Sequence, residues 1–114
     1  MKVLLDECVT RKLRSRLPNH QVATVREMHW NGLRNGNLMR VAVEAGFDVL
    51  LTIDKNLEYQ QNLKSFDLIV VVFDVRENKV SAFEPLLSLF EQQLQGFSKG
   101  VAYRIENLDT TSST

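Results

Sequence analysis

The sequence predicts an α/β protein, a three-layer α/β/α sandwich with a mainly parallel sheet of about five strands. Short apolar, β-branched segments alternate along the chain with segments whose apolar residues recur at helical spacing. The apolar segments are nearly continuous, as expected for strands that are buried on both faces. Strand–helix alternation of this kind is typical of a parallel sheet that helices cover on both sides.

The first part of the chain contains two of the predicted strands. Residues 2–5 form an apolar strand, and residues 6–17 carry apolar side chains at every fourth position, which predicts a helix. Pro18 ends this helix. The β-branched residues within 20–25 predict the second strand.

The middle of the chain predicts a loop, a helix and a third strand. Residues 26–37 contain two glycines and three asparagines, which indicates a loop with a short helical turn. Residues 38–46 form a helix with Gly46 as its C-cap. Residues 48–52 read as a buried strand, and residues 54–66 as polar and helical in part.

The last part contains the clearest helix. Residues 67–73 form a continuous apolar strand, and residues 79–97 carry apolar side chains at alternating spacings of three and four. Pro85 lies early in this helix and marks either a kink or its true first turn. Residues 100–105 close the domain as a last strand.

The length of 114 residues predicts one domain, residues 1–106, followed by a polar, disordered tail at residues 107–114. Hydrophobic residues make up 44% and charged residues 25%, which is ordinary for a globular protein. The formal net charge is zero, so binding to nucleic acid would need a local basic patch rather than a field over the whole protein.

A cytoplasmic location without membrane insertion is expected. The single cysteine, Cys8, excludes a disulfide framework within the chain and fits a reducing compartment. The apolar run at the start is too short for a signal peptide and is interrupted by Asp6. No apolar run approaches the roughly 20 residues that a membrane-spanning helix needs.

Acidic side chains follow two of the predicted strands. Asp6 and Glu7 come directly after residues 2–5, and Asp54 lies two positions after residues 48–52. The carboxyl ends of parallel strands share one edge of the sheet, where ligands bind. Neighbouring carboxylates repel unless a cation or a proton compensates them, and hard oxygen ligands suit Mg²⁺ or Mn²⁺. The pattern points to metal-assisted phosphodiester hydrolysis, with helix capping as the alternative role of each aspartate.

Three stretches, "KVLLDECV", "GLRNGNLMRVAVEAGFDVLLTIDKNLEYQQNL" and "DLIVVVF", resemble the small PIN-like proteins of bacteria, which are relatives of the VapC-type ribonuclease toxins. The resemblance covers about 100 residues from the N-terminus. It implies a PIN-like α/β/α sandwich that holds one or two Mg²⁺ or Mn²⁺ ions with carboxylates and cuts RNA through a metal-activated water.

The resemblance also implies roles for individual residues. Asp6 and Asp54 match the acids that hold the metal, and Glu7 becomes a third ligand or the base for water. The protein would be the toxin of a toxin–antitoxin pair, with an antitoxin protein from a neighbouring gene that blocks the site.

The chain departs from the family pattern at three positions. Asn35, Asn37 and Asn56 stand where relatives often carry acids. An asparagine offers a neutral oxygen to a cation but no negative charge and no base. A catalytically weak or inactive PIN-like module that binds a partner protein or RNA is therefore the alternative function. A receiver-like signalling domain is a third reading, because it shares an α/β sheet with an acid cluster.

Four further residues are candidates for substrate binding. Arg11 and Lys55 would contact phosphates, and Asn35 would orient the substrate. Trp30 would stack on a base or, alternatively, pack as a lid or within a homodimer interface. A solvated surface is the alternative role of the basic side chains.

Overall fold

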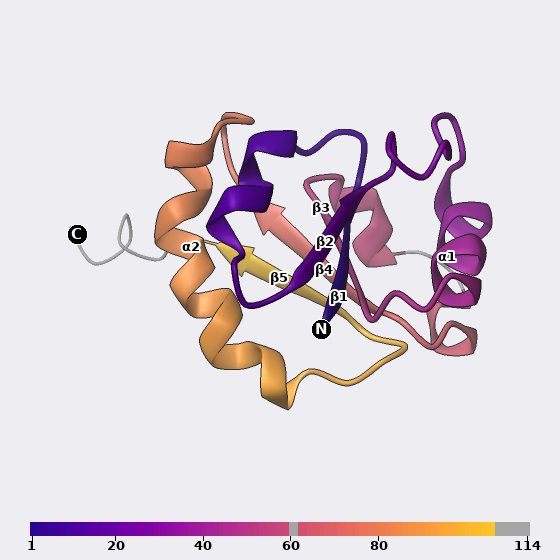
Figure 1. The fold of residues 1–114 in the computed structure, drawn as a ribbon. Helices are drawn as coiled ribbons and strands as arrows, with labels where there is room; N and C mark the ends of the chain where they lie inside the picture. The colour runs from indigo at the N-terminus through magenta and orange to yellow at the C-terminus, as the bar shows by residue number, and fades with distance from the viewer. Residues whose placement is uncertain (60–61, 107–114) are drawn as a thin grey trace.

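The computed structural model describes residues 1–59 and 62–106, and in these residues five strands form one sheet in the order β2-β1-β3-β4-β5 (Figure 1). All four strand pairings are parallel. The predicted α/β fold is confirmed, and the sheet is fully rather than mainly parallel. The strands are β1 Lys2–Leu5, β2 Gln21–Thr24, β3 Val49–Thr52, β4 Ile69–Asp74 and β5 Ala102–Glu106.

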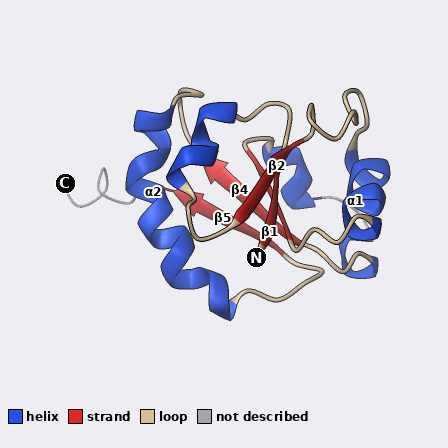
Figure 2. Ribbon diagram, in the orientation of Figure 1, coloured by secondary structure: helices blue, strands red, loops and turns tan. Residues whose placement is uncertain are grey.

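Helices connect the strands and cover both faces of the sheet, with α1 and α2 on opposite sides (Figure 2). The two α-helices are α1 Asn35–Glu44 and α2 Val80–Gln93. The shorter 3₁₀ helices are η1 Arg11–Arg16, η2 Lys55–Tyr59, η3 Leu63–Ser65 and η4 Leu94–Gly96.

The core is divided by the sheet into two apolar clusters, because successive strand residues point to opposite faces. Leu5 and Leu51 face one side, where they pack with η1 and α2. Leu4 and Leu50 face the other side, where they pack with α1 and η2. All four leucines have no exposed surface. This two-sided burial explains why the strands are continuously apolar.

The connection from β4 to β5 has a hand opposite to that of the other three. The chain crosses from β1 to β2 over the η1 face, then reverses direction and runs from β2 to β3 and β4 over the α1 face. Reversing both direction and face preserves the hand of a crossover. The connection from β4 to β5 runs in the same direction along the sheet as the connections from β2 to β3 and from β3 to β4. Its helix, α2, lies on the η1 face instead of the α1 face, so the hand of this crossover is opposite. Crossovers of one hand dominate in parallel sheets, which makes this an unusual connection.

This connection distinguishes the fold from a receiver-like domain. The order β2-β1-β3-β4-β5 is that of flavodoxin-like sheets, which include receivers. Crossovers of uniform hand would place α2 on the face of α1, however, whereas here α2 packs beside η1. Arg16 of η1 pairs with Glu84 of α2 at 3.2 Å.

The helix predicted for residues 6–17 is wrong over its first half. Residues 6–10 form a turn closed by the Val9 N–H to the Asp6 carbonyl at 2.9 Å, and only η1 is helical. Thr10 caps η1 through its side chain. The apolar spacing still identified the buried face, because Leu13 and Leu17 are both buried in one cluster. With six residues, η1 is longer than most 3₁₀ helices.

The remaining predicted elements match the structure within a few residues. The predicted C-cap is off by one residue: Ala45 is the C-cap of α1, and Gly46 follows it in the left-handed conformation, with a φ of 87° and an N–H that donates to the Val43 carbonyl at 3.0 Å. The segment 79–97 is α2 followed by η4, with Pro85 inside α2. In the described residues no helix is long and apolar enough to cross a membrane. The tail predicted to be disordered, 107–114, lies outside the described residues.

Candidate active site

The candidate site lies where the connections from two neighbouring strands diverge. The chain leaves β1 toward the η1 face and leaves β3 toward the α1 face, so a crevice opens beyond the carboxyl ends of these strands. A cavity of about 570 Å³ occupies this position, and we call it the main cavity because most of the predicted site residues line it, although a hollow of about 630 Å³ beside Glu58 and Gly100 is larger. The predicted site residues Asp6, Glu7, Asp54 and Asn35 line it, together with Arg34 and Asn56.

Thr52 joins the two aspartates. Its hydroxyl donates to Oδ2 of Asp6 at 2.7 Å and accepts a hydrogen bond from the backbone N–H of Asp54 at 3.0 Å. Thr52 is fully buried, so both bonds lie in a region of low dielectric. Oδ1 of Asp6 accepts from the N–H of Glu7 at 2.8 Å. The ends of β1 and β3 are thereby tied to each other through one side chain.

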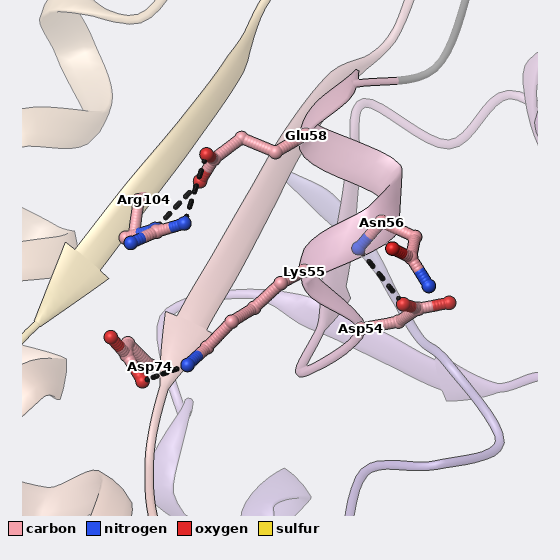
Figure 3. A network of polar contacts seen from close by, with 6 residues as sticks. All are labelled: Asp54, Lys55, Asn56, Glu58, Asp74 and Arg104. Atoms are coloured by element: carbon pink, nitrogen blue, oxygen red, sulfur yellow. Dashed lines mark hydrogen bonds and ion pairs between the residues drawn. The ribbon is translucent and has the colours of Figure 1, made fainter.

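The capping alternative holds for Asp54 but not for Asp6. Oδ1 of Asp54 accepts from the N–H of Asn56 at 3.0 Å, at the start of η2 (Figure 3). For the η1 helix the cap is Thr10 rather than Asp6. A capping carboxylate retains a second oxygen, so the cap and a role in the main cavity are compatible at Asp54.

The η2 helix is held from the side that faces away from Asp54. Lys55 reaches Asp74 at 2.9 Å, and Glu58 accepts two hydrogen bonds from Arg104, at 2.8 and 3.1 Å (Figure 3). The Glu58 carboxylate raises the pKa of Arg104 above its ordinary value. Lys55, a predicted phosphate contact, is thus directed to the end of β4 and does not line the main cavity.

The main cavity concentrates negative charge that no basic side chain pairs with. Most acidic side chains form ion pairs, as Asp74 does with Lys55. Asp6, Glu7 and Asp54 form none within the described residues, which include every lysine, arginine and histidine of the chain. Carboxylates grouped in this way call for a cation or a proton.

In the described part of the chain, the lining of the main cavity offers a hard cation two aspartates and two side-chain amides rather than a cluster of three acids. Asp6 and Asp54 supply carboxylate oxygens, and Asn35 and Asn56 add amide oxygens to the lining. Among residues 1–59 and 62–106, no three His, Cys, Asp or Glu side chains are grouped closely enough to hold a metal ion. Mg²⁺ commonly binds through one or two carboxylates, with water and substrate phosphate completing its shell.

The thiol of Cys8 adjoins this network. Its Sγ atom lies 3.6 Å from Oδ2 of Asp6 and 3.5 Å from the Thr52 hydroxyl. Burial raises the pKa of Cys8, and the Asp6 carboxylate raises it further. The raised pKa keeps the group as the neutral thiol at neutral pH, which is the less reactive form.

A second hollow of about 310 Å³ lies on the other side of Asp6 and Glu7, which line both spaces. Arg11, a predicted phosphate contact, lines this second hollow and not the main cavity. Asn78 accepts from the N–H of Thr10 at 2.7 Å, which ties the β4–α2 loop to the start of η1. Thr10, Arg11, Arg26, Asn31 and Asn78 complete most of the lining.

Trp30 is separate from both spaces. It is half-buried and packs edge-on against Phe47, with ring centroids 6.0 Å apart. This contact places Trp30 in the cluster under α1. Its predicted stacking on a base and its alternative role in a homodimer stay predictions.

Three site residues were missed by reasoning from the sequence. Thr52 ends a buried strand as a polar residue, which was a usable signal. Arg26 and Asn78 lie in loops far apart in the chain, and no local pattern marks them.

Comparison of the chain with protein-family models, with curated proteins and with solved structures finds no match.

Proposed function

We propose that this protein is a metal-dependent ribonuclease of the PIN-like type that acts in the cytoplasm as the toxin of a toxin–antitoxin pair. The observation that carries the proposal is the link from Asp6 through Thr52 to Asp54, at the point where the connections of β1 and β3 diverge. Acids without basic partners at such a crevice are suited to a divalent cation and a phosphate group.

The chain's own residues divide the work of hydrolysis. Asp6 and Asp54 would hold Mg²⁺ or Mn²⁺, and the ion would supply an activated water and neutralise charge on the phosphate. Glu7 is exposed at the cavity and accepts the proton of the attacking water. The water oxygen forms a bond to phosphorus, the bond from phosphorus to one ribose oxygen breaks, and that oxygen takes a proton from solvent. Asn35 orients the phosphate that is cleaved, and Arg34 binds the backbone next to it.

Cleavage of labelled RNA in Mn²⁺ tests this proposal. Asp6→Asn and Asp54→Asn are expected to lower the rate at least about 100-fold, because each removes charge from the cation site. Asp67→Asn is the matched control, since Asp67 is an exposed aspartate at the opposite edge of the sheet, before β4. Equal cleavage by wild type and by the site variants would assign the activity to a contaminant and end the proposal.

The toxin role has its own test. Induced expression in bacteria is expected to arrest growth, and co-expression of the protein from the neighbouring gene is expected to relieve the arrest. Growth that continues at a verified level of folded wild-type protein would contradict the toxin role but not the ribonuclease activity.

The second candidate is a PIN-like module that binds RNA or a partner protein with little or no catalysis. The observation that favours it is Asn35, which has a φ of 49°, a left-handed conformation that asparagine tolerates better than most residues. This backbone conformation accounts for an asparagine at position 35 without any catalytic role for its side chain. Calorimetric titration with Mn²⁺ separates the candidates, because binding that Asp54→Asn abolishes contradicts an inactive site.

A further inference from the structure

Three arginines without carboxylate partners surround the acids of the candidate site. Within the described residues, Arg14, Arg16, Arg40 and Arg104 form ion pairs, whereas Arg11, Arg26, Arg34 and Arg76 do not. All four of the latter are exposed, and Arg76 lines neither the main cavity nor the second hollow. Arg34 lines the main cavity, and Arg11 and Arg26 line the second hollow. The unpaired positive charge therefore flanks the unpaired negative charge on two sides.

The two spaces adjoin at Asp6 and Glu7, and each has the size of a ligand site. Their volumes, about 570 and 310 Å³, both fall within the range of about 300–1,000 Å³ that is usual for small-molecule sites. Each also contains side-chain amides, from Asn35 and Asn56 in the main cavity and from Asn31 and Asn78 in the second hollow. The second hollow is built rather than incidental, because the Asn78–Thr10 bond fixes two of its walls.

Acids flanked by arginines on two sides suit a chain of several phosphates better than a single phosphate group. A guanidinium binds a phosphate through two parallel hydrogen bonds, while a carboxylate repels it unless a cation intervenes. One phosphate of a strand can lie over the acids with the cation, and the phosphates before and after it then lie beside the arginines. Such contacts hold the backbone without reading sequence.

We propose that the second hollow is a substrate subsite, and that single-stranded RNA passes from the main cavity over Asp6 and Glu7 into it. Arg34 binds the backbone on one side of the cleaved phosphate, and Arg11 and Arg26 bind it on the other. This inference rests on the proposed function and specifies its substrate as a strand that continues on both sides of the cut. A mononucleotide or a strand end fills only one of the two spaces.

The test is binding of fluorescent oligouridine in Mg²⁺ to a Glu7→Gln background, which lacks the proposed base and keeps the cation site, measured by anisotropy for a dinucleotide and for a strand of about eight nucleotides. Arg26→Ala and Arg11→Ala are expected to weaken binding of the longer strand about threefold to tenfold, and each is expected to reduce the salt slope by about 1. The dinucleotide is expected to respond to Arg34→Ala alone. Lys64→Ala is the control, because Lys64 is exposed before β4 at the opposite edge of the sheet.

The outcomes separate this inference from the proposed function. The subsite would be overturned if Arg26→Ala and Arg11→Ala bound the longer strand as tightly as the control Lys64→Ala does. This conclusion would hold whatever the cleavage assay gives. Equal binding of a duplex of the same length would overturn the single-strand specificity. Arg26→Lys, which keeps the charge but loses the paired hydrogen bonds, is expected to bind between wild type and Arg26→Ala. Cleavage lost in Asp54→Asn remains the separate test of the nuclease.

Discussion

The hydroxyl of Thr52 donates a hydrogen bond to Oδ2 of Asp6 across 2.7 Å, and this bond joins the ends of two neighbouring parallel strands. The same oxygen accepts from the N–H of Asp54. One buried threonine thus fixes the orientation of one carboxylate and the backbone of the other. The relative position of the two aspartates depends on a residue that carries no charge.

Replacing Thr52 tests this dependence. Thr52→Val keeps the shape but leaves the N–H of Asp54 without a partner and Oδ2 of Asp6 with only the weak thiol donor of Cys8, so we expect a loss of about 1–3 kcal/mol in the free energy of unfolding. RNA cleavage is expected to fall as well, because Asp6 loses its orientation. Thr52→Ser retains the hydroxyl and is expected to recover most of the activity. Urea unfolding and cleavage kinetics measure both effects, and a Ser variant as impaired as the Val variant would contradict this positioning role.

Replacing Lys55 tests whether its side chain points away from the main cavity and the second hollow. Because Lys55 pairs with Asp74 and lies outside both cavities, Lys55→Met is expected to change oligouridine affinity less than about twofold and to leave the salt slope unchanged. The free energy of unfolding is expected to fall by less than about 1 kcal/mol, as for other exposed ion pairs. A salt slope reduced by about 1 in the anisotropy assay would instead make Lys55 a phosphate contact.

Cys8 reports on the surroundings of Asp6. Burial raises the pKa of the thiol, and the Asp6 carboxylate adds to the effect, so alkylation by iodoacetamide at pH 8 is expected to be slow and to accelerate as the pH rises. Asp6→Asn removes the negative charge, which is expected to lower this pKa and speed the reaction. The protein unfolded in urea provides the reference rate, and a native rate equal to it would contradict the raised pKa.

Asp48 contributes stability that depends on pH. The N–H of Lys2, at 2.8 Å, and then Lys99 hold the pKa of Asp48 below its ordinary value. A carboxyl whose pKa is lower in the folded state stabilises the fold above its unfolded pKa and loses this effect as the pH falls through the folded pKa. Asp48→Asn is therefore expected to cost about 1 kcal/mol at pH 7 and progressively less in strong acid, as measured by urea unfolding. A cost that is constant with pH would contradict this linkage.

Gly100 is required by its backbone. It has a φ of 82°, and a Cβ there would lie 3.3 Å from Cα of Lys64. Gly100→Ala is expected to lower the free energy of unfolding by about 2 kcal/mol, because strain and crowding add. Gly96→Ala is the control, since nothing lies within 4 Å of its added Cβ and its φ is not left-handed. Thermal unfolding of the two variants compares them, and equal midpoints would contradict the requirement.

The sequence was sufficient for the elements and for the edge of the sheet that carries the acids. A buried strand imposes a continuous apolar run on the local sequence, and β3 shows it. Asp6 and Asp54 follow two such runs, and in a parallel sheet this alone places them at the same edge. The prediction failed over residues 6–10, because a turn and a long helix can present the same apolar spacing.

Contacts between residues distant in the chain were decided only by the tertiary structure. Local sequence does not encode that β1 and β3 are neighbours, that Thr52 bridges the aspartates, or that α2 covers the face of η1. It also does not encode that Lys55 turns to Asp74, or that Arg26 and Asn78 line the same hollow beside Asp6. These features follow from how the strands are ordered and packed, and many distant residues share in determining that order. The sequence by itself thus determined which acids reach the edge of the sheet, while the packed fold determined what surrounds them.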